Sequence, residues 1–86
     1  MKAGKKGKAV KKLPNKELTK LGNRIKELRI KKGYTNYEFF AYDHKIPRAQ
    51  YGRYENGEDM RYSSLLRLIN AFGMTQKEFF SEGFND

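Results

Sequence analysis

The chain has 86 residues, of which 37% are hydrophobic and 14% aromatic, and it carries a formal net charge of +9. This length predicts one small domain with a modest core, and the absence of cysteine excludes a disulfide framework. A single histidine without cysteine argues against a zinc site, so we expect no metal and no other cofactor. No apolar run is long enough for the core of a signal peptide or for a membrane span, so we expect a cytoplasmic protein with no membrane partner.

The positive charge is concentrated at the amino terminus. Residues 1–16 contain seven lysines and no acidic residue, whereas residues 17–86 contain 12 basic and 10 acidic residues and are nearly neutral. Such a lysine-rich segment cannot form a core, so we expect a disordered tail over residues 1–15 and a folded domain over residues 16–86. The expected partner of the tail is a polyanion, with nucleic acid as the first candidate. The alternative is a solubilising extension or a cloning remnant.

The first predicted helix begins after Pro14. Asn15 is a favoured N-cap residue, and Gly33 is suited to end the helix. Between them, apolar residues recur at spacings of three and four and so share one helical face; they are Leu18, Leu21, Ile25 and Leu28. We expect a solvated basic face to include Lys20, Arg24, Lys31 and Lys32.

Two shorter helices follow. Residues 35–38, Thr-Asn-Tyr-Glu, have the capping-box pattern, and residues 39–41 continue the second helix. That helix is short because Ile46 precedes a proline and should be extended. Pro47 suits the first turn of a third helix, predicted over about residues 47–55.

Turn residues also mark the end of the third helix and the start of the fourth. The sequence Asn56-Gly57 tolerates positive φ and ends the third helix. A polar loop follows, and Ser63 or Ser64 is expected to cap the fourth helix. Its apolar face contains Leu65, Leu68, Ile69 and Phe72.

A fifth helix completes the predicted bundle. Gly73 stops the fourth helix, and residues 75–78 form a second capping box. The fifth helix contains residues 79–80 and ends at Gly83, after which Phe84 folds back on the bundle. Five short helices with tight connections predict an all-α fold, a compact five-helix bundle.

The third helix has two different sides. Tyr51 and Tyr54, three residues apart, form the natural core side. Another face combines long cations with small side chains, namely Arg48, Ala49, Gly52 and Arg53. Such a face admits the major groove of DNA, because arginine bonds both acceptors of guanine while small residues leave room for base edges. Gln50, near the amino end, is expected to reach a base or a phosphate.

The simpler interpretation is an exposed helix with ordinary surface arginines. A short helix, a tight turn and a second short helix with a basic face nevertheless form a helix-turn-helix arrangement, whose second helix enters the groove. Three segments occur in the expected order: LGNRIKELRIKKGYT, FFAYDHKIPRAQYGRYENG and SSLLRLINAFGMTQKEFF. With them, residues 21–83 resemble the Cro/cI-type (XRE-type) helix-turn-helix family, to which lambdoid phage repressors belong. The resemblance implies a lambda-repressor-like bundle that recognises double-stranded DNA through its third helix.

The resemblance also implies roles for individual residues. Positions that usually face DNA bases are occupied by Arg48, Ala49, Gln50, Gly52 and Arg53. Phosphate contacts are expected from Asn36, Tyr37, Pro47, Asn56 and Arg61, and on grounds of charge from Lys11 and Lys12 in the tail. Packing positions of the family are matched by Ala41, Ile46, Tyr51 and Tyr54. Arg29 and Glu55 match a partly buried ion pair between the first and third helices.

The sequence departs from the family pattern around the turn. Lys45 stands where members usually have glycine, so the turn is expected to cost about 1 kcal/mol or to have a different shape. One extra residue lies between Gly33 and Ala41. The glutamine that often begins the second helix is missing, and Asn36 or Tyr37 takes its place. These departures allow a recognition surface that docks in an altered pose.

Other polar residues have structural interpretations. We expect His44 to be a partly buried core residue. The serines at positions 63 and 64 lack a neighbouring base that would make them nucleophiles, and the acidic residues 55, 58 and 59 suggest a solvated turn. We therefore expect no enzymatic activity.

These observations predict a sequence-specific, nucleoid-associated transcriptional regulator that acts as a repressor. A single small domain covers few base pairs, so we expect a homodimer formed through the fifth helix and Phe84. No small-molecule ligand is expected. Two alternatives remain open: an antitoxin-like or bridging module that binds a protein partner, and an RNA-binding protein whose affinity comes from the basic tail.

Overall fold

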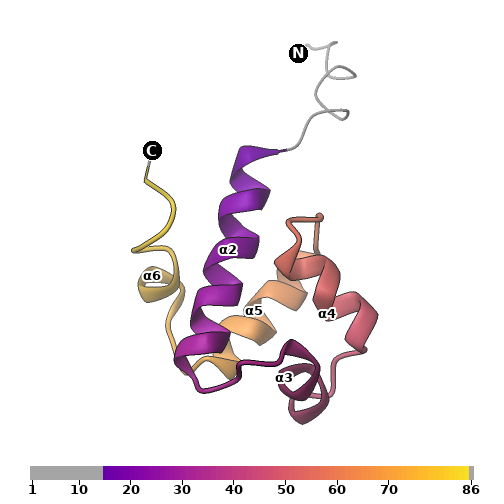
Figure 1. Cartoon of the computed structure of the whole chain (residues 1–86). Helices are drawn as coiled ribbons and strands as arrows, with labels where there is room; N and C mark the ends of the chain where they lie inside the picture. The colour runs from indigo at the N-terminus through magenta and orange to yellow at the C-terminus, as the bar shows by residue number, and fades with distance from the viewer. Residues whose placement is uncertain (1–14, 86) are drawn as a thin grey trace.

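The protein is an all-helical bundle. The computed structural model describes residues 15–85, and within this range the chain forms five helices and no strand (Figure 1). The helices are α2 (Lys16–Lys31), α3 (Tyr37–Asp43), α4 (Arg48–Glu55), α5 (Tyr62–Ala71) and α6 (Gln76–Phe79). The long helix α2 contacts α4, while α3 packs on α4 and α5 on α6. The all-α prediction is confirmed for these residues; the predicted tail, apart from Asn15, lies outside them.

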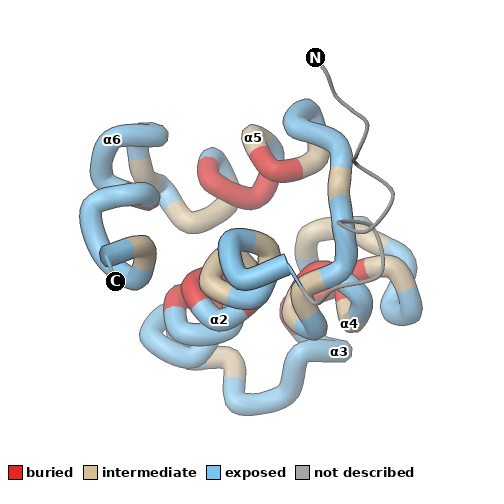
Figure 2. Tube along the Cα trace, turned by 90° about the horizontal axis from the view of Figure 1, so that it is seen from above, coloured by how far each residue is buried: buried red, intermediate tan, exposed pale blue. Residues whose placement is uncertain are grey.

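The core lies where these helices face one another. Its buried members are Ile25, Leu28, Phe40, Ala41, Tyr51, Tyr54, Leu65, Leu68, Ile69 and Phe79. Figure 2 shows the buried segments of α2, α4 and α5 turned toward the middle of the molecule, with exposed backbone around them. The apolar positions spaced by three and four residues in the sequence supply most of this core, as helical periodicity predicts.

The ends of α2 follow local sequence signals. The Asn15 side chain accepts hydrogen bonds from the backbone nitrogens of Glu17 and Leu18, at 2.9 and 3.2 Å. These bonds satisfy two of the four unpaired donors at the start of the helix. Gly33, with φ of +105°, follows its carboxyl end. Both predicted boundaries are confirmed.

The start of α3 differs by one residue from the prediction. Asn36, not Thr35, is the N-cap, and its side-chain oxygen accepts a hydrogen bond from the Glu38 nitrogen at 2.7 Å. Asparagine is at least as good a cap as threonine, and a helix that begins after Asn36 still buries Phe40 and Ala41. The third helix likewise starts one residue late: Pro47 is the N-cap of α4, and its carbonyl accepts from the Tyr51 nitrogen.

The serine cap predicted for the fourth helix is wrong. Helix α5 begins at Tyr62, with Arg61 as an N-cap that makes no side-chain capping bond, so both serines lie in the first turn. The Tyr62 hydroxyl is hydrogen-bonded to the side chain of Gln76, the first residue of α6. The earlier start of α5 therefore coincides with a contact between α5 and α6. No capping residue in the local sequence marks this start.

The last helix is shorter than predicted. Thr75 and Glu78 form the expected capping box, but α6 ends at Phe79, and Phe80 is the C-cap. The Ser81 hydroxyl donates to the Glu78 carbonyl at 2.6 Å, and this bond satisfies one carbonyl at the helix end. Gly83 is therefore not the residue that ends the helix. The prediction that Phe84 folds back is confirmed, because Phe84 packs against the core and its ring lies 6.1 Å from the ring of the buried Phe79.

Arg24 does not belong to the solvated basic face. Its side chain is buried, and its guanidinium donates to the carbonyls of Phe79 at 2.8 Å and Glu78 at 3.1 Å. Carbonyl groups point outward at the carboxyl end of a helix, and a cation interacts favourably with them. Arg24 thus connects α2 to α6 and is a structural residue.

Candidate nucleic-acid interface

Helices α3 and α4 and the turn between them form the candidate interface. The turn is closed by hydrogen bonds from the His44 nitrogen to the Phe40 carbonyl at 3.0 Å and from the Ile46 nitrogen to the Ala41 carbonyl at 2.9 Å. Lys45 has φ of +60°, the left-handed conformation that glycine adopts most easily. The turn therefore has the left-handed residue expected at that position, although a lysine occupies it.

Aromatic packing orients α4 against α3. Tyr51 and Tyr54 are buried, and the Tyr51 ring lies 5.2 Å from Phe40 and 6.0 Å from Tyr37. Ala41, also buried, allows the two helices to approach closely. We call the side of α4 that carries Tyr51, Tyr54 and Glu55 its inner face. The close packing holds α4 in one orientation.

A buried ion pair holds the same inner face to α2. Arg29 and Glu55 form two parallel hydrogen bonds, at 2.8 and 2.9 Å, with side chains only 5% and 9% exposed. The guanidinium also donates to the Tyr34 carbonyl at 2.7 Å. The hydrogen bond to Glu55 raises the pKa of Arg29 above its ordinary value, and burial raises the pKa of Tyr51 beside the pair. Arg29 is therefore a structural residue.

Gly22 has a role that sequence reasoning missed. A Cβ atom at this position would lie 2.6 Å from the Glu55 carbonyl oxygen and 2.9 Å from the Gly57 nitrogen. Both neighbours are backbone atoms, which cannot move aside without displacing the end of α4. The sequence around Gly22 gives no sign of this contact, because the approach of α2 to α4 is a feature of the tertiary structure.

The opposite side of α4 is polar and open. We call it the outer face and define it by Arg48, Ala49 and Arg53, all of which are exposed. Gln50 is half-buried, and its amide is hydrogen-bonded to the Tyr54 hydroxyl. Gly52 is also half-buried: a Cβ there would point at the Tyr37 hydroxyl, 3.4 Å away. The five residues predicted to face DNA bases thus divide into three outer and two flanking positions.

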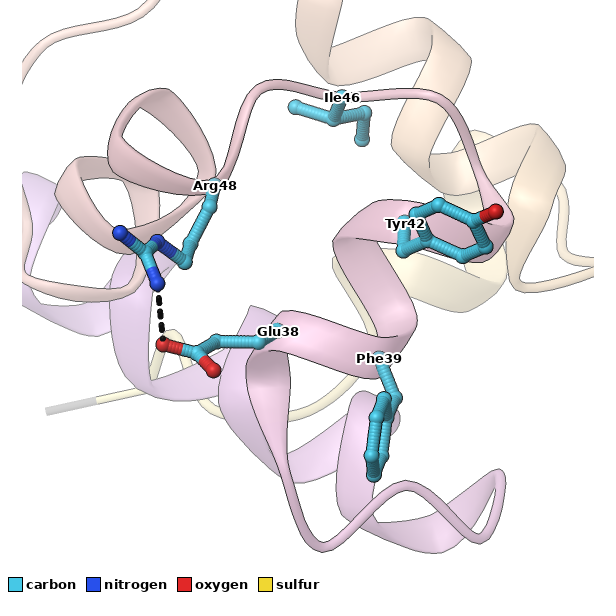
Figure 3. A pocket seen from close by; sticks show the side chains of 5 residues that line it. All are labelled: Glu38, Phe39, Tyr42, Ile46 and Arg48. Atoms are coloured by element: carbon cyan, nitrogen blue, oxygen red, sulfur yellow. Dashed lines mark hydrogen bonds and ion pairs between the residues drawn. The ribbon is translucent and has the colours of Figure 1, made fainter.

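Each outer arginine has a carboxylate beside it. Arg48 Nη1 lies 3.2 Å from Glu38 Oε2, and Figure 3 shows the two side chains pointing toward one another from α4 and α3. Arg53 Nε lies 4.0 Å from Glu58 Oε1. These side chains are between 46% and 69% exposed, so solvent screens both pairs and each contributes little to folding.

The predicted phosphate contacts lie around this face. Asn36 and Tyr37 are exposed at the start of α3, Pro47 at the start of α4, and Asn56 and Arg61 after its end. A polar hollow of about 220 Å³ is lined by Gln50, Arg53, Tyr54, Asp59, Met60, Arg61 and Ser64. It brings Arg61 close to the outer face. Lys11 and Lys12 lie outside the described residues.

His44 sits under the turn. It is half-buried, with its ring 4.3 Å from Phe40 and 6.4 Å from Tyr34. Its Nε2 is buried without a hydrogen-bond partner among the described residues. Over residues 15–85, no group of three histidine or acidic side chains converges in a way that could hold a metal ion.

Comparison with known proteins agrees with this geometry. A family model described as helix-turn-helix matches residues 25–75, more than half of the chain. The protein therefore belongs to the Cro/cI-type (XRE-type) helix-turn-helix family and is a DNA-binding regulator in the general sense of that family. Searches of curated proteins and of solved structures found no match. No helix in the described part of the chain is long and apolar enough to cross a membrane.

Proposed function

We propose that the protein is a sequence-specific transcriptional repressor that binds its operator as a homodimer. The observation that carries this proposal is the outer face of α4, where Arg48, Ala49 and Arg53 are exposed while the inner face is buried and tied to α2 by an ion pair. A rigid helix with arginines at its outer face can enter the major groove as one unit. Each arginine then has donors for the two acceptors of guanine.

Phosphate contacts set the position of the helix in the groove. Arg61 lines the same hollow as Arg53, and its guanidinium can bind one phosphate of the DNA backbone there. At the other end, Asn36 and Tyr37 stand exposed at the start of α3. We assign phosphate contacts to both ends and to the lysine-rich segment at residues 1–16.

Dimerisation follows from the size of the site. A single α4 helix reaches only a few base pairs, and a two-fold dimer doubles the site to two half-sites about one helical turn apart. Phe80 is 42% exposed and lies beside Phe84 at the end of the bundle. We assign the dimer contact to this aromatic pair, as the sequence suggested. A dimer that occupies a promoter competes with the transcription machinery, which leads to repression in the nucleoid.

The test is selection from randomised duplex DNA by the full-length protein at about 150 mM salt, a concentration at which non-specific phosphate binding is weakened. We expect enrichment of a motif with two inverted halves. A motif without symmetry would contradict the dimer. Binding without enrichment that disappears as salt rises would contradict sequence-specific recognition and would favour binding through the lysine-rich tail, to RNA as readily as to DNA.

A further inference from the structure

Glu38 is an acidic side chain placed on the proposed DNA-binding surface. It stands in the first turn of α3, and its carboxylate accepts a hydrogen bond from Arg48 at 3.2 Å (Figure 3). Both side chains are largely exposed, so the pair adds little to folding. A carboxylate at this position repels the phosphates of any DNA sequence, so general affinity does not explain why it stands beside a base-reading arginine.

The chemistry of the pair suggests an explanation. A guanidinium has five N–H donors, of which Arg48 uses one toward Glu38, and a carboxylate has only acceptors. In the major groove, a G·C pair presents the N7 and O6 acceptors of guanine next to the N4 amino donor of cytosine. The donors of Arg48 are complementary to the two guanine acceptors, and the Glu38 carboxylate is complementary to the amino donor of cytosine. An A·T pair, with adenine in place of guanine, instead offers the carboxylate the O4 acceptor and the methyl group of thymine.

We propose that Glu38 is a specificity-determining residue. It orients the Arg48 guanidinium and accepts a hydrogen bond from the amino group of cytosine, so that the two side chains together select a G·C pair. This inference rests on the proposed function, in which the outer face of α4 enters the major groove. Glu38 thereby lowers affinity for DNA in general and raises discrimination at one base pair.

Selection from randomised duplex DNA with Glu38→Gln tests this inference. Glutamine keeps the length of the side chain and removes its charge. We expect tighter binding to random DNA and a loss of roughly tenfold in the preference for the G·C pair, the range of one good base contact. Glu17→Gln is the matched control, because Glu17 is also an exposed acidic residue in the first turn of a helix and pairs with Lys20 at 3.5 Å. The control should leave the base preference unchanged.

Two further variants separate orientation from charge. Glu38→Asp keeps the charge but shortens the side chain. It should therefore weaken the preference for the G·C pair without tightening the binding to random DNA. In an Arg48→Ala background, Glu38→Gln should cause no further change of preference at that position, because coupled residues are not additive. If the motif of Glu38→Gln is the same as that of the unmodified protein, the inference is wrong while the proposed function stands. If the unmodified protein enriches no motif, the proposed function is wrong and this inference falls with it.

Discussion

Arginine–glutamate pairs lie at both faces of α4, and the buried Arg29–Glu55 pair differs in its surroundings from the exposed Arg48–Glu38 pair. On the inner face, Arg29 and Glu55 are nearly fully buried and joined by two short hydrogen bonds. On the outer face, Arg48 and Glu38 are exposed and joined by one longer contact. Because the inner pair is buried, removal of either partner leaves the other charge buried without a counter-charge and destabilises the fold. Exposure leaves the outer pair free to exchange its contact for one with a partner.

The largest expected effect comes from breaking the inner pair. Glu55→Ala leaves the Arg29 guanidinium buried without its carboxylate, and we expect the free energy of unfolding to fall by about 3–5 kcal/mol. Urea denaturation followed by circular dichroism measures this loss. The control is Glu38→Ala on the outer face, for which we expect a loss of about 0–1 kcal/mol. Equal losses for the two variants would contradict the distinction between the faces.

The close approach of α2 to the end of α4 is the next target. Gly22→Ala places a Cβ 2.6 Å from the Glu55 carbonyl oxygen, so we expect the same denaturation measurement to show a loss of about 1–3 kcal/mol from overpacking. Gly52→Ala is the matched control, because its Cβ would meet the Tyr37 side chain at an ordinary 3.4 Å. Alanine is favoured over glycine in a helix, so the control should gain about 0.5–1 kcal/mol. A stable Gly22→Ala variant would argue against this contact.

On the outer face, substitution should change binding and leave folding intact. Arg53→Ala removes an exposed guanidinium, and we expect a loss of about 1–3 kcal/mol of binding free energy at one base position, with relaxed preference there. Titration of the selected operator and of single-base variants measures this change. A uniform loss over all sequences would instead identify Arg53 as a phosphate contact.

The inner face should also control stability at alkaline pH. Burial, with a further contribution from the Glu55 carboxylate, raises the pKa of Tyr51 above its ordinary value of 10.0. The folded protein keeps this proton at a pH where the unfolded chain releases it. The associated stability is therefore fully present below pH 10.0 and is lost as pH rises above it, by up to about 1.4 kcal/mol per pH unit.

Tyr51→Phe should remove this part of the alkaline loss. Urea denaturation at about pH 9 and about pH 11 compares the variant with the unmodified protein. Tyr42→Phe is the control, because it removes the same hydroxyl group from a side chain that is exposed and lies outside the core. An alkaline loss that is the same in all three proteins would contradict a buried, protonated Tyr51.

The smallest effect is expected at the turn that joins the two helices. Lys45 has φ of +60°, and glycine adopts this conformation without the cost of a Cβ. We therefore expect Lys45→Gly to raise the free energy of unfolding by about 0.5–1 kcal/mol. Lys32→Gly is the control, since Lys32 has φ of −77° and gains nothing from glycine. A gain in both variants would show that loss of lysine charge, not turn geometry, is responsible.

Much of the fold could be predicted from short-range sequence signals. Asn15, Thr75 and Gly33 lie at helix ends because caps and positive φ depend on residues within one turn. The core periodicity depends on the same local geometry, so Tyr51 and Tyr54 fall on the buried side of α4. The sequence pattern of the helix-turn-helix segment also indicated the family, and the match to residues 25–75 agrees with it.

Other features depended on how distant segments meet. Arg24 appears in the sequence as one cation among several, and only the position of α6 brings the carbonyls of Glu78 and Phe79 to it. Gly22 appears as an isolated glycine inside a helix, and only the crossing of α2 and α4 brings the Glu55 carbonyl close. Glu38 and Arg48 are ten residues apart and belong to different helices, so no helical spacing rule pairs them.

The sequence by itself therefore indicated the order of the helices and the family, because each of these depends on patterns within a few residues. Only the tertiary structure decided which arginines are structural and which remain available to a partner. Arginines 24, 29, 48 and 53 have the same side chain, and they differ in the burial and in the partners that packing supplies. The energy of a charge depends on its surroundings, and those surroundings come from residues far away in the chain.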